Sequence, residues 1–530
     1  MASPRERSTP PLRTLLNAAR APLHPQRQSK SFLRRSARHV TVEVSLSHCT
    51  VVERKAKAPG KADKQGKERR HALLWEDVLG AHRLPVTAAT DPSDDADDPP
   101  LGSRFVLYAM PSSDNGNGAS PKHRSLREWH VSFAGGDDEL SELLAWLNWL
   151  ADPRNAIERE AATSLDALSR TPRPRRRFLV LINPVGGSGR GVKRFERYVA
   201  PVFEGANIEP VVQLTERAGH SAEIMQTLPL GTYDCVVTVG GDGSLAEVFQ
   251  GLMQRADWRD AIQQPIGVVP GGSGNGLFVS LMHALGERFH ASNAAFVLSK
   301  GLAQPLDLTA IRNDHGDRVY SFLSTEWALI SDVDVESERL RALGGLRFTV
   351  LFALHILLYR KEYEGTIWYL EDPEDAAASA REPMPFSGHE RPGLELLENV
   401  ADGALANDGS GARWRRRSGL FHLAWVMNTS HAASDGHTAP GAQCGDGYNY
   451  ILLLDRAHAR TDLIKLLLAL ESGEHLDKTP AQLIKTRAFR IEPARPEDGI
   501  CVDGEPFRGP VEGQVHHRVA RVVSLPRSAA

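Results

Sequence analysis

The sequence has few cysteines, no long apolar run and no excess of charge of either sign. Its 530 residues include four cysteines, which lie far apart and form no Cys-x-x-Cys pair. A disulfide scaffold and a zinc ribbon are therefore excluded, and a reducing compartment is expected. No apolar run reaches the roughly 18 residues of a membrane-spanning helix, so we expect none. The 63 Lys and Arg residues nearly balance the 66 Asp and Glu residues, so no nucleic-acid partner is expected.

The N-terminal 38 residues are basic. They contain eight arginines and a single acidic residue, Glu6, together with several serines and prolines. This composition predicts a disordered basic tail over residues 1–38. Two sharper interpretations stay open: an organelle transit peptide, and a segment that contacts an anionic membrane.

A small module is expected over residues 39–152. Three segments, 39–53, 101–109 and 129–133, have the composition of strands, and the first alternates apolar and polar side chains. Leucines then recur at helical spacing over residues 137–151. This order, strands followed by one amphipathic helix, favours a membrane- or partner-binding module of pleckstrin-homology type.

Two further segments lack the pattern of a folded core. Residues 153–174 are polar and end in a stretch rich in Pro and Arg, which predicts a linker. Residues 371–419 are rich in Ala, Glu, Asp, Gly and Pro and show little periodicity. Such a segment cannot bury enough apolar surface to offset its ordering entropy, so we expect a mostly disordered insertion.

Three short apolar runs are each followed by a glycine-rich loop. The runs are 178–182, 235–239 and 266–269, and the loops are 183–191, 240–243 and 270–276. Runs that are apolar on both faces and separated by helical segments predict a parallel sheet covered on both sides. Ligands of such sheets bind beyond the carboxyl ends of the strands, which is where all three loops lie.

The first loop is suited to binding an anion. Glycines let backbone N–H groups approach a phosphate, and residues 192–203 predict a helix whose N-terminus adds positive charge. The loop is not a Walker A motif, because Val192 stands where that motif needs Lys, and it is not a Rossmann fingerprint. Taken alone, it is equally compatible with a plain tight turn.

The second loop places Asp242 between glycines at a strand end, where its carboxylate can reach a substrate. Ser244 and Glu247 have the spacing of a helix capping box, and an apolar helix face follows. Glycines on both sides of an aspartate allow a phosphate on the backbone and a base beside it. A solvated aspartate in an Asx turn is the plain alternative. Three such loops along one sheet edge favour the functional interpretation.

Several longer motifs accompany these loops. They are Asn183–Gly191, Gly241–Met253, Pro270–Asn275, Ser331–Glu338 with Arg341, Gly344 and Arg347–Thr349 after it, and Val502–Glu505. With these motifs the chain resembles the diacylglycerol kinase catalytic family and, within it, the sphingosine kinase branch. The resemblance covers about residues 175–526, interrupted by the insertion. The glycine loops mark the wider family, and the Asp-Val-Asp-x-Glu-Ser-Glu segment indicates sphingoid substrates.

The resemblance implies a fold that is α/β plus all-β. A nucleotide-binding kinase domain with a parallel sheet would span residues 175–305, and a β-sandwich lipid-binding domain would span residues 306–526. Asp242 would be the general base, Asp334 would hold the sphingoid amine, and Ser324 would contact the substrate. The residues implied to bind ATP are Asn183, Gly186, Gly187, Thr215, Gly241, Gly243, Gly272, Ser273, Asn275, Glu338, Arg341, Arg347, Gly504 and Glu505. Mg²⁺ would accompany ATP, with Asp503 as a candidate ligand.

Four small residues depart from the family pattern. Gly240, Gly276, Ala328 and Ser331 stand where Ser, Ala, Gly and Ala are usual. All are small-for-small changes, so they bear on pocket shape and chain-length preference more than on catalysis.

The residues themselves leave several alternatives open. If the acidic segment is a strand, Asp332 and Asp334 share a face, so spacing alone does not choose between them and only the resemblance favours Asp334. Arg341 and Arg347 are equally readable as surface arginines. The apolar stretches 346–359 and 462–470 fit a lipid-tail pocket, a surface that faces the membrane, or ordinary core helices. His431, His437 and Cys444 are irregularly spaced, so no zinc site is expected.

The leading interpretation is an ATP-dependent kinase that phosphorylates the primary hydroxyl of sphingosine or a related sphingoid base. The sphingoid amine is cationic, which accounts for a second carboxylate. One alternative is a diacylglycerol or ceramide kinase, whose substrates have no free amine. Another is a soluble-substrate kinase of NAD-kinase type, which shares the Gly-Gly-Asp-Gly loop. Because sphingoid bases partition into bilayers, we expect a cytoplasmic protein in peripheral contact with a membrane, with organelle targeting as an open alternative.

Overall fold

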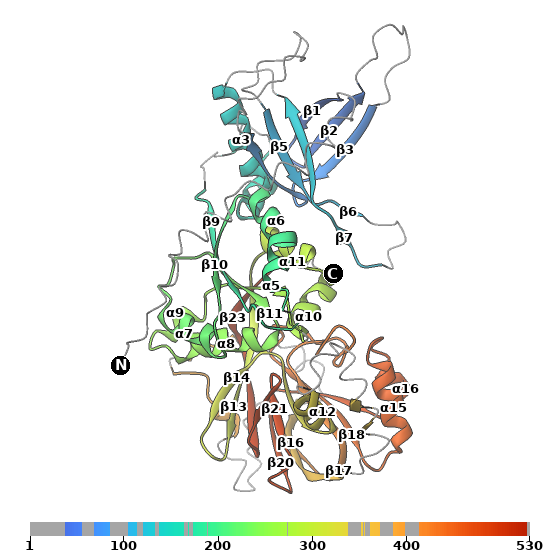
Figure 1. The fold of residues 1–530 in the computed structure, drawn as a ribbon. Helices are drawn as coiled ribbons and strands as arrows, with labels where there is room; N and C mark the ends of the chain where they lie inside the picture. The colour runs from blue at the N-terminus through green and yellow to red at the C-terminus, as the bar shows by residue number, and fades with distance from the viewer. Residues whose placement is uncertain are drawn as a thin grey trace, which may run out of the picture.

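The computed structural model describes residues 38–55, 68–84, 104–113, 120–132, 137–163, 168, 173–187, 189–272, 274–337, 351–352, 354–355, 361–371, 385–388, 390–397 and 413–526. They form three regions stacked along the long axis of the molecule: an N-terminal β-rich module, a central α/β region and a C-terminal β region (Figure 1). This architecture confirms the predicted fold class. Of the predicted tail over residues 1–38, residues 1–37 lie outside the described residues and Arg38 begins the first strand.

The N-terminal module combines small antiparallel sheets with one helix. The strand orders are β1–β2–β3, β4–β5–β8 and β6–β7. The elements are β1 (Arg38–Val44), β2 (His48–Lys55), β3 (Glu68–Leu74), β4 (Val78–Arg83), β5 (Arg104–Ala109), β6 (Ser112–Ser113), β7 (His123–Arg124), β8 (Arg127–Ser132) and α3 (Asp137–Ala151). The predicted helix over 137–151 is confirmed. The predicted single strand over 39–53 is wrong, because Ser45 turns the chain by bonding to His48 and makes a hairpin of it.

Buried cations join this module to the α/β region. Lys300 Nζ donates to the carbonyl oxygens of Trp75 at 2.9 Å and Val78 at 2.8 Å. Burial lowers the pKa of Lys300 to about 7. Arg124 Nε lies 2.8 Å from a carboxylate oxygen of Glu287, which is itself buried. These bonds compensate the desolvation of the cations and fix the module on the rest of the chain.

Part of the predicted linker is folded. Residues 153–161 form η1 (Pro153–Asn155) and α4 (Ala156–Ala161). The guanidinium of Arg159 is buried and donates to the Leu150 carbonyl oxygen at 2.6 Å. The polar composition of this segment therefore reflects internal hydrogen bonds rather than an extended linker.

The α/β region is built on the predicted parallel sheet. Its strand order is β10–β9–β11–β12, with parallel pairing throughout. The strands are β9 (Arg176–Ile182), β10 (Ile208–Leu214), β11 (Cys235–Gly240) and β12 (Ile266–Pro270). The helical elements are α5 (Gly191–Arg194), the π-helical turn η3 (Phe195–Val199), α6 (Ala200–Gly205), α7 (His220–Thr227), α8 (Asp242–Gln254), α9 (Trp258–Ala261), α10 (Gly276–Leu285) and α11 (Ala291–Lys300). The three glycine loops follow β9, β11 and β12 at one edge.

The predicted capping box of α8 is wrong. The helix begins at Asp242, two residues before Ser244, so Ser244 is not its N-cap. The carboxylate of Glu247 instead accepts the backbone N–H groups of Gly219 at 2.7 Å and Ser221 at 3.2 Å, at the start of α7. The spacing of Ser244 and Glu247 predicted a hydrogen bond within α8. The start of α7 instead offers Glu247 backbone N–H groups that have no partner within their own helix.

The C-terminal β region continues the same sheet. From β12 the strand order runs β23–β20–β16–β17–β15–β21–β22; in addition, β13 pairs with β23 and β14, and β18 pairs with β17 and β19. The strands are β13 (Leu302–Asn313), β14 (Arg318–Ser321), β15 (Ser324–Ala328), β16 (Tyr363–Glu371), β17 (Arg413–Met427), β18 (Asn449–Asp455), β19 (Gln482–Thr486), β20 (Ala488–Pro493), β21 (Ile500–Val502), β22 (Glu505–Phe507) and β23 (Val511–Ser524). The helices are α12 (Leu329–Ser337), α15 (Arg460–Ala469) and α16 (His475–Lys478). Among the described residues no helix is long and apolar enough to cross a membrane.

The expected disorder of the 371–419 insertion is wrong for the residues that the structure describes. Leu394 and Leu397 are buried, the latter in η5 (Glu395–Leu397), and Trp414 is buried at the start of β17. Arg391 donates to carbonyl oxygens at the end of α8, with Nε 3.0 Å from that of Met253. These few side chains are enough to hold the segment against the rest of the molecule, although its sequence has no regular hydrophobic period.

Candidate active site

The first glycine loop is shaped by the side chain of Asn183. Its Oδ1 accepts the backbone N–H groups of Val185 at 3.1 Å and Gly186 at 2.9 Å, which turns the chain directly after β9. Gly187 has a φ of +56°, and a Cβ on it would lie 2.6 Å from the Gly271 carbonyl oxygen. Glycine is therefore required at 187 for two reasons, the backbone conformation and the approach of the third loop.

The second and third loops touch each other through their backbones. A Cβ added to Gly272 would lie 2.4 Å from the Cα of Gly241. The Asp242 N–H donates to the Gly274 carbonyl oxygen at 3.2 Å, and Asn275 Nδ2 donates to the Gly272 carbonyl oxygen at 2.9 Å. The predicted ATP-site residues Gly186, Gly187, Gly241, Gly272 and Asn275 thus lie together. The glycines of these loops therefore form a surface of backbone groups without Cβ atoms at the carboxyl edge of the sheet.

Thr215 lies beside the first loop. It follows β10, is buried, and its backbone N–H donates to the carbonyl oxygen of Ile182, the last residue of β9, at 2.9 Å. It therefore adds a short polar side chain at the end of β9, the strand that leads into Asn183. Ser273, in the third loop, lies outside the described residues.

Asp242 is the buried acid of this edge. Its side chain is 7% exposed, and Oδ2 accepts the Gly276 N–H at 2.7 Å. Within the part of the chain that the structure describes, Oδ1 is buried and has no hydrogen-bond partner. Burial raises the pKa of Asp242 to about 7, the backbone N–H groups of Gly276 and Leu277 oppose this rise, and the negative charge of Asp503 adds to it. The group is thus poised to exchange a proton near neutral pH.

The turn between β21 and β22 closes the site from the far end of the chain. Glu505 Oε1 lies 3.8 Å from the position of a Cβ on Gly243, so its carboxylate stands beside the second loop. Asp503 has a φ of +51° and is followed by Gly504 with a φ of +85°. This tight turn brings the predicted residues 503–505 to the glycine loops, although more than 200 residues separate them in sequence.

Asp503 itself fastens a second turn. Its Oδ1 accepts the Ser321 hydroxyl at 2.7 Å and the backbone N–H groups of Leu323 and Ser324 at 3.0 Å each, and Oδ2 accepts the Phe322 N–H at 3.2 Å. Burial raises the pKa of Asp503, although these donors oppose the rise. The carboxylate therefore holds the start of β15, and with it Ser324, in place.

The acidic segment is a helix and not a strand, so Asp332 and Asp334 do not share a face. Asp332 accepts from Lys361 Nζ at 2.8 Å and from the Tyr363 hydroxyl at 2.6 Å. Asp334 Oδ2 lies 3.6 Å from the position of a Cβ on Gly504. The helix thus separates an ion-paired aspartate from one that faces the turn of residues 503–505.

Sequence reasoning missed Glu326, which lies between these groups. It is 6% exposed on β15, and its Oε1 accepts the Ser324 hydroxyl at 2.9 Å. Burial raises the pKa of Glu326 well above its usual value, and the negative charge of Asp334 adds to the rise. Its signal in the sequence was a lone acid in a short strand, two residues after Ser324 and so on the same face.

Three residues predicted for the ATP site lie outside the described residues: Arg341 and Arg347, the predicted phosphate contacts, and Glu338 near them. Most of the apolar stretch 346–359 also lies outside them. The other apolar stretch, 462–470, overlaps α15, where Leu463 and Leu466 are buried while Leu468 is 79% exposed. A cavity of about 30 Å³ beside α12 is lined by Leu329, Lys361, Tyr363, His422 and Leu463, among others. A cavity of about 370 Å³ lies between α3 and the start of β9, away from the glycine loops.

Comparison with known proteins gives matches across the same residues. A profile of the diacylglycerol kinase catalytic domain matches residues 177–311. The chain is 33% identical to sphingosine kinase 1 of Homo sapiens over 366 residues, which covers 67% of this chain and 92% of the relative. It is 32% identical to sphingosine kinase 2 of Arabidopsis thaliana over 372 residues, covering 69% and 73%. A solved structure of a diacylglycerol kinase from Bacillus anthracis aligns with a TM-score of 0.42 and 14% identity, covering 66% of this chain and 97% of that chain.

Proposed function

This chain belongs to the sphingosine kinase family of lipid kinases, and we propose that it transfers the γ-phosphoryl group of ATP to the primary hydroxyl of sphingosine or a related sphingoid base. The product would be the sphingoid base 1-phosphate. The observation that supports this proposal most directly is Asp242. It is a buried carboxylate with one unpartnered oxygen, set beside three backbone loops that are suited to a triphosphate.

In the proposed reaction, the backbone N–H groups of the glycine loops bind the phosphates, with Asn183, Thr215 and Asn275 shaping the nucleotide site. Phosphoryl transfer depends mostly on positioning and on neutralising the triphosphate. Arg341 and Arg347, together with Glu338 and Ser273, complete this set as predictions from the family motifs.

Asp242 acts as the general base. A primary alcohol does not ionise at neutral pH, so its proton leaves late, as the hydroxyl oxygen forms its bond to the γ-phosphorus. The bond from that phosphorus to the bridging oxygen breaks, ADP leaves with the electron pair, and the proton goes to Asp242. A pKa of about 7 makes the carboxylate basic enough to take that proton.

Mg²⁺ would neutralise charge on the phosphates. The carboxylates beside the second loop suit such an ion, since Mg²⁺ in kinases is held by one or two carboxylates plus substrate phosphates. Asp503 already accepts four hydrogen bonds, so Glu505, beside Gly243, is the better placed of the two acids to approach the metal.

The substrate amine is assigned to Asp334. A sphingoid base carries a cationic amine, and Asp334 faces the turn of residues 503–505, whereas Asp332 is already neutralised by Lys361. Ser324 and Glu326 add polar groups on the same face of β15. Diacylglycerol and ceramide lack the amine, so this arrangement favours a sphingoid base over either of them.

The test is a radiolabelled-ATP assay against sphingosine, phytosphingosine, ceramide and diacylglycerol. We expect the two sphingoid bases to be phosphorylated. Asp334→Asn should raise the KM for sphingosine at least about tenfold with little change in the KM for ATP, since it removes a charge partner of the amine. The matched variant Asp332→Asn should leave the KM for sphingosine within about twofold. Preference for diacylglycerol, or an unchanged KM in Asp334→Asn, would contradict the assignment.

We also propose that the protein works in the cytoplasm in peripheral contact with a membrane, because its substrate partitions into bilayers. The basic residues 1–38 and the N-terminal module, of pleckstrin-homology type by our prediction, are the proposed contacts. Binding to anionic vesicles that weakens on removing residues 1–38 would support the membrane role. Equal binding by both proteins would favour organelle targeting or a plain tail.

A further inference from the structure

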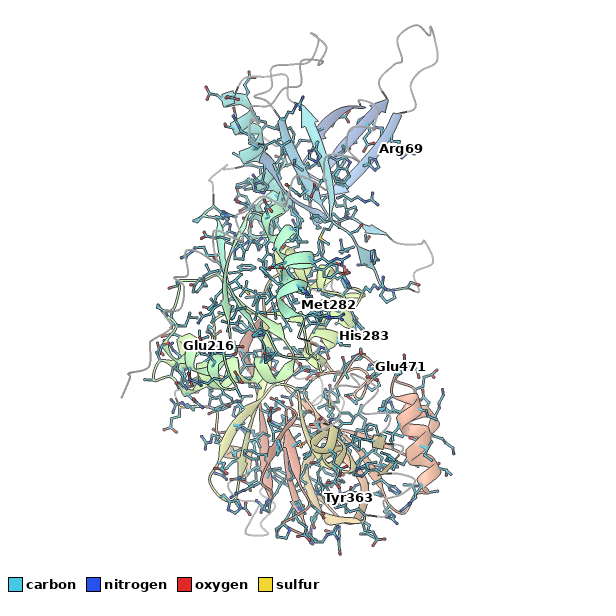
Figure 2. The ribbon with its side chains drawn as sticks, viewed as in Figure 1. Arg69, Glu216, Met282, His283, Tyr363 and Glu471 are labelled. Atoms are coloured by element: carbon cyan, nitrogen blue, oxygen red, sulfur yellow. The ribbon has the colours of Figure 1, made fainter. Side chains whose placement is uncertain are left out.

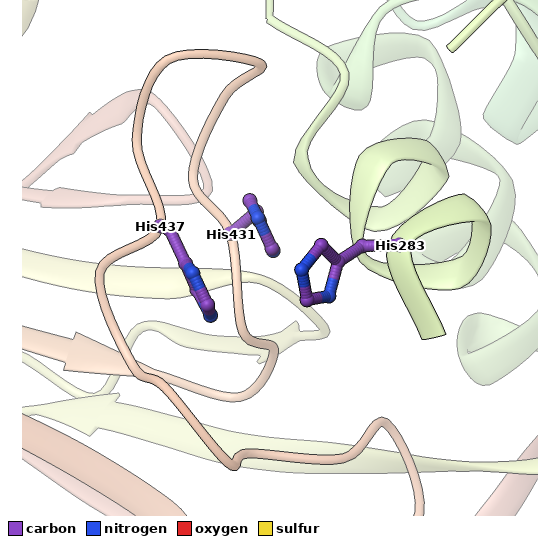
Figure 3. Close-up of side chains that lie close together, drawn as sticks. All are labelled: His283, His431 and His437. Atoms are coloured by element: carbon purple, nitrogen blue, oxygen red, sulfur yellow. The ribbon is translucent and has the colours of Figure 1, made fainter. Parts of the chain in front are cut away.

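Three histidines from two regions of the molecule converge near the active site. His283 comes from α10 of the α/β region, and His431 and His437 come from the segment between β17 and β18 of the β region (Figures 2 and 3). One ring nitrogen of each lies within 4.8 Å of those of the other two. The ring centroids of His431 and His437 are 4.1 Å apart, and His283 lies 4.6 Å and 4.9 Å from them.

We propose that this three-histidine cluster (His283, His431 and His437) binds a divalent transition metal ion of the Zn²⁺ type and thereby joins α10 to the β region. Imidazole nitrogens are ligands that Zn²⁺ accepts readily, and sets of three histidines leave a fourth position for water or another ligand. This inference concerns a site separate from Asp242 and does not depend on the identity of the lipid substrate.

The nitrogen distances need only a small adjustment, but His431 and His437 are stacked with an angle of 4° between their planes, so one of these rings must also turn for both to face one ion. Tetrahedral Zn²⁺ with bonds of about 2.0–2.1 Å places its nitrogens about 3.4 Å apart, so each ring must move by less than about 1 Å. His283 is exposed on α10 and is therefore able to turn toward the other two.

The backbone around the cluster is already fixed. The His431 N–H donates to the Ser280 hydroxyl, one turn before His283 on α10, at 3.0 Å. The His437 N–H donates to the Leu470 carbonyl oxygen at 3.0 Å. His431 Nδ1 lies 2.8 Å from the Ser430 hydroxyl, a contact of the kind that orients metal-ligating imidazoles. The ordering cost of bringing the three ligands together is thus met largely by the fold itself.

A neighbouring side chain supports a polar role for this region. His475 is fully buried, and within the described part of the chain neither of its ring nitrogens has a hydrogen-bond partner. His475 begins α16, five residues after Leu470, whose carbonyl oxygen accepts the His437 N–H. A buried imidazole without a partner is costly, so an ordinary packing role does not explain His475.

The ion would act on the active site through α10. That helix begins at Gly276, whose N–H bonds to Asp242, and a Cβ on Gly276 would lie 2.8 Å from the His431 carbonyl oxygen. A metal bound by all three histidines would therefore hold α10, whose first residue bonds to Asp242, against the segment that carries His431 and His437. Sequence spacing did not reveal this site, because His283 lies about 150 residues before its partners.

The experiment uses the full-length protein, stripped of metal with a zinc-selective chelator and then given one equivalent of Zn²⁺ or Co²⁺. We expect one zinc per chain to survive gel filtration, measured by elemental analysis, and Co²⁺ to show the intense visible bands of a four-coordinate ion. His283→Ala should bind zinc at least about tenfold more weakly. His283 is exposed, so this variant should fold, which circular dichroism would verify.

Two further variants keep the result interpretable. His437→Ala should lose zinc as His283→Ala does, whereas His315→Ala, which alters an exposed histidine in the β13–β14 turn, should bind like the wild type. Zinc should raise the melting temperature of the wild type and of His315→Ala but not that of His283→Ala. A wild type that retains no zinc, or a His283→Ala variant that retains it fully, would overturn the proposal.

Discussion

Replacing Asp242 by Asn should damage catalysis and stabilise the fold at the same time. The general base would be lost, so kcat should fall about 10²-fold or more. The opposite effect on stability follows from the carboxylate's burial, because the pKa of Asp242 is raised from 3.8 to about 7. The charged form is therefore less stable in the folded protein than in the unfolded chain.

The sign and size of the stability effect follow from that shift. Below pH 3.8 Asp242 is mostly protonated in both the folded and the unfolded state, so it does not lower the free energy of unfolding. The free energy of unfolding then falls as the pH rises to about 7 and stays constant above that pH. Between pH 5 and pH 8 the wild type should lose about 2.7 kcal/mol that Asp242→Asn does not lose, at about 1.36 kcal/mol per pH unit up to the folded pKa. The new amide has no partner at the Oδ1 position, which costs about 1–3 kcal/mol, but that cost does not depend on pH.

The assay is denaturant unfolding followed by tryptophan fluorescence at pH 5 and pH 8. Asp242→Asn should gain about 2.7 kcal/mol over the wild type between the two pH values. The control Asp260→Asn removes the same charge from an exposed position on α9 and should gain almost nothing. If the two variants change in parallel with pH, or if Asp242→Asn keeps near-normal turnover, the buried-base argument is refuted.

Three smaller predictions follow from packing and hydrogen bonding. Gly276→Ala should lower the free energy of unfolding by about 1–3 kcal/mol, because its Cβ would lie 2.6–2.8 Å from Leu323 and from the carbonyl oxygens of His431 and Ala432. The control Gly499→Ala, whose Cβ would have its nearest neighbour at 3.6 Å, should have the melting temperature of the wild type. Glu326→Gln keeps an acceptor for Ser324 but removes a charge whose pKa is raised, so its melting temperature should increasingly exceed that of the wild type as the pH rises above 4.5, the ordinary pKa of glutamate; parallel curves would contradict this. Arg391→Ala should lower the free energy of unfolding by about 1–2 kcal/mol, because it loses the hydrogen bonds to the end of α8. The control is Glu390→Ala, at an exposed neighbouring position. If the melting curves of the two variants are the same, residues 385–397 are not anchored there.

Parts of the structure could be read from local sequence because their causes are local. A strand that is buried on both faces needs a continuous apolar run, and a backbone that must approach an anion or another backbone needs glycine. The three runs and their loops therefore gave the parallel sheet and the sheet edge where Asp242 lies. The leucine spacing over 137–151 gave α3 for the same reason, since one helix face covers a core.

Other features depended on partners far away in the chain. The role of Glu247 was mispredicted because its oxygens meet α7 rather than its own helix, and the 385–397 segment packs although it has no period. Asp332 and Asp334 could not be told apart until α12 was seen to turn one toward Lys361 and the other toward Gly504. Glu326 and the three-histidine cluster belong to the same class. A single buried acid or an isolated histidine carries no pattern of its own, and its chemistry is set by the burial and the neighbouring charges that only the folded chain brings together.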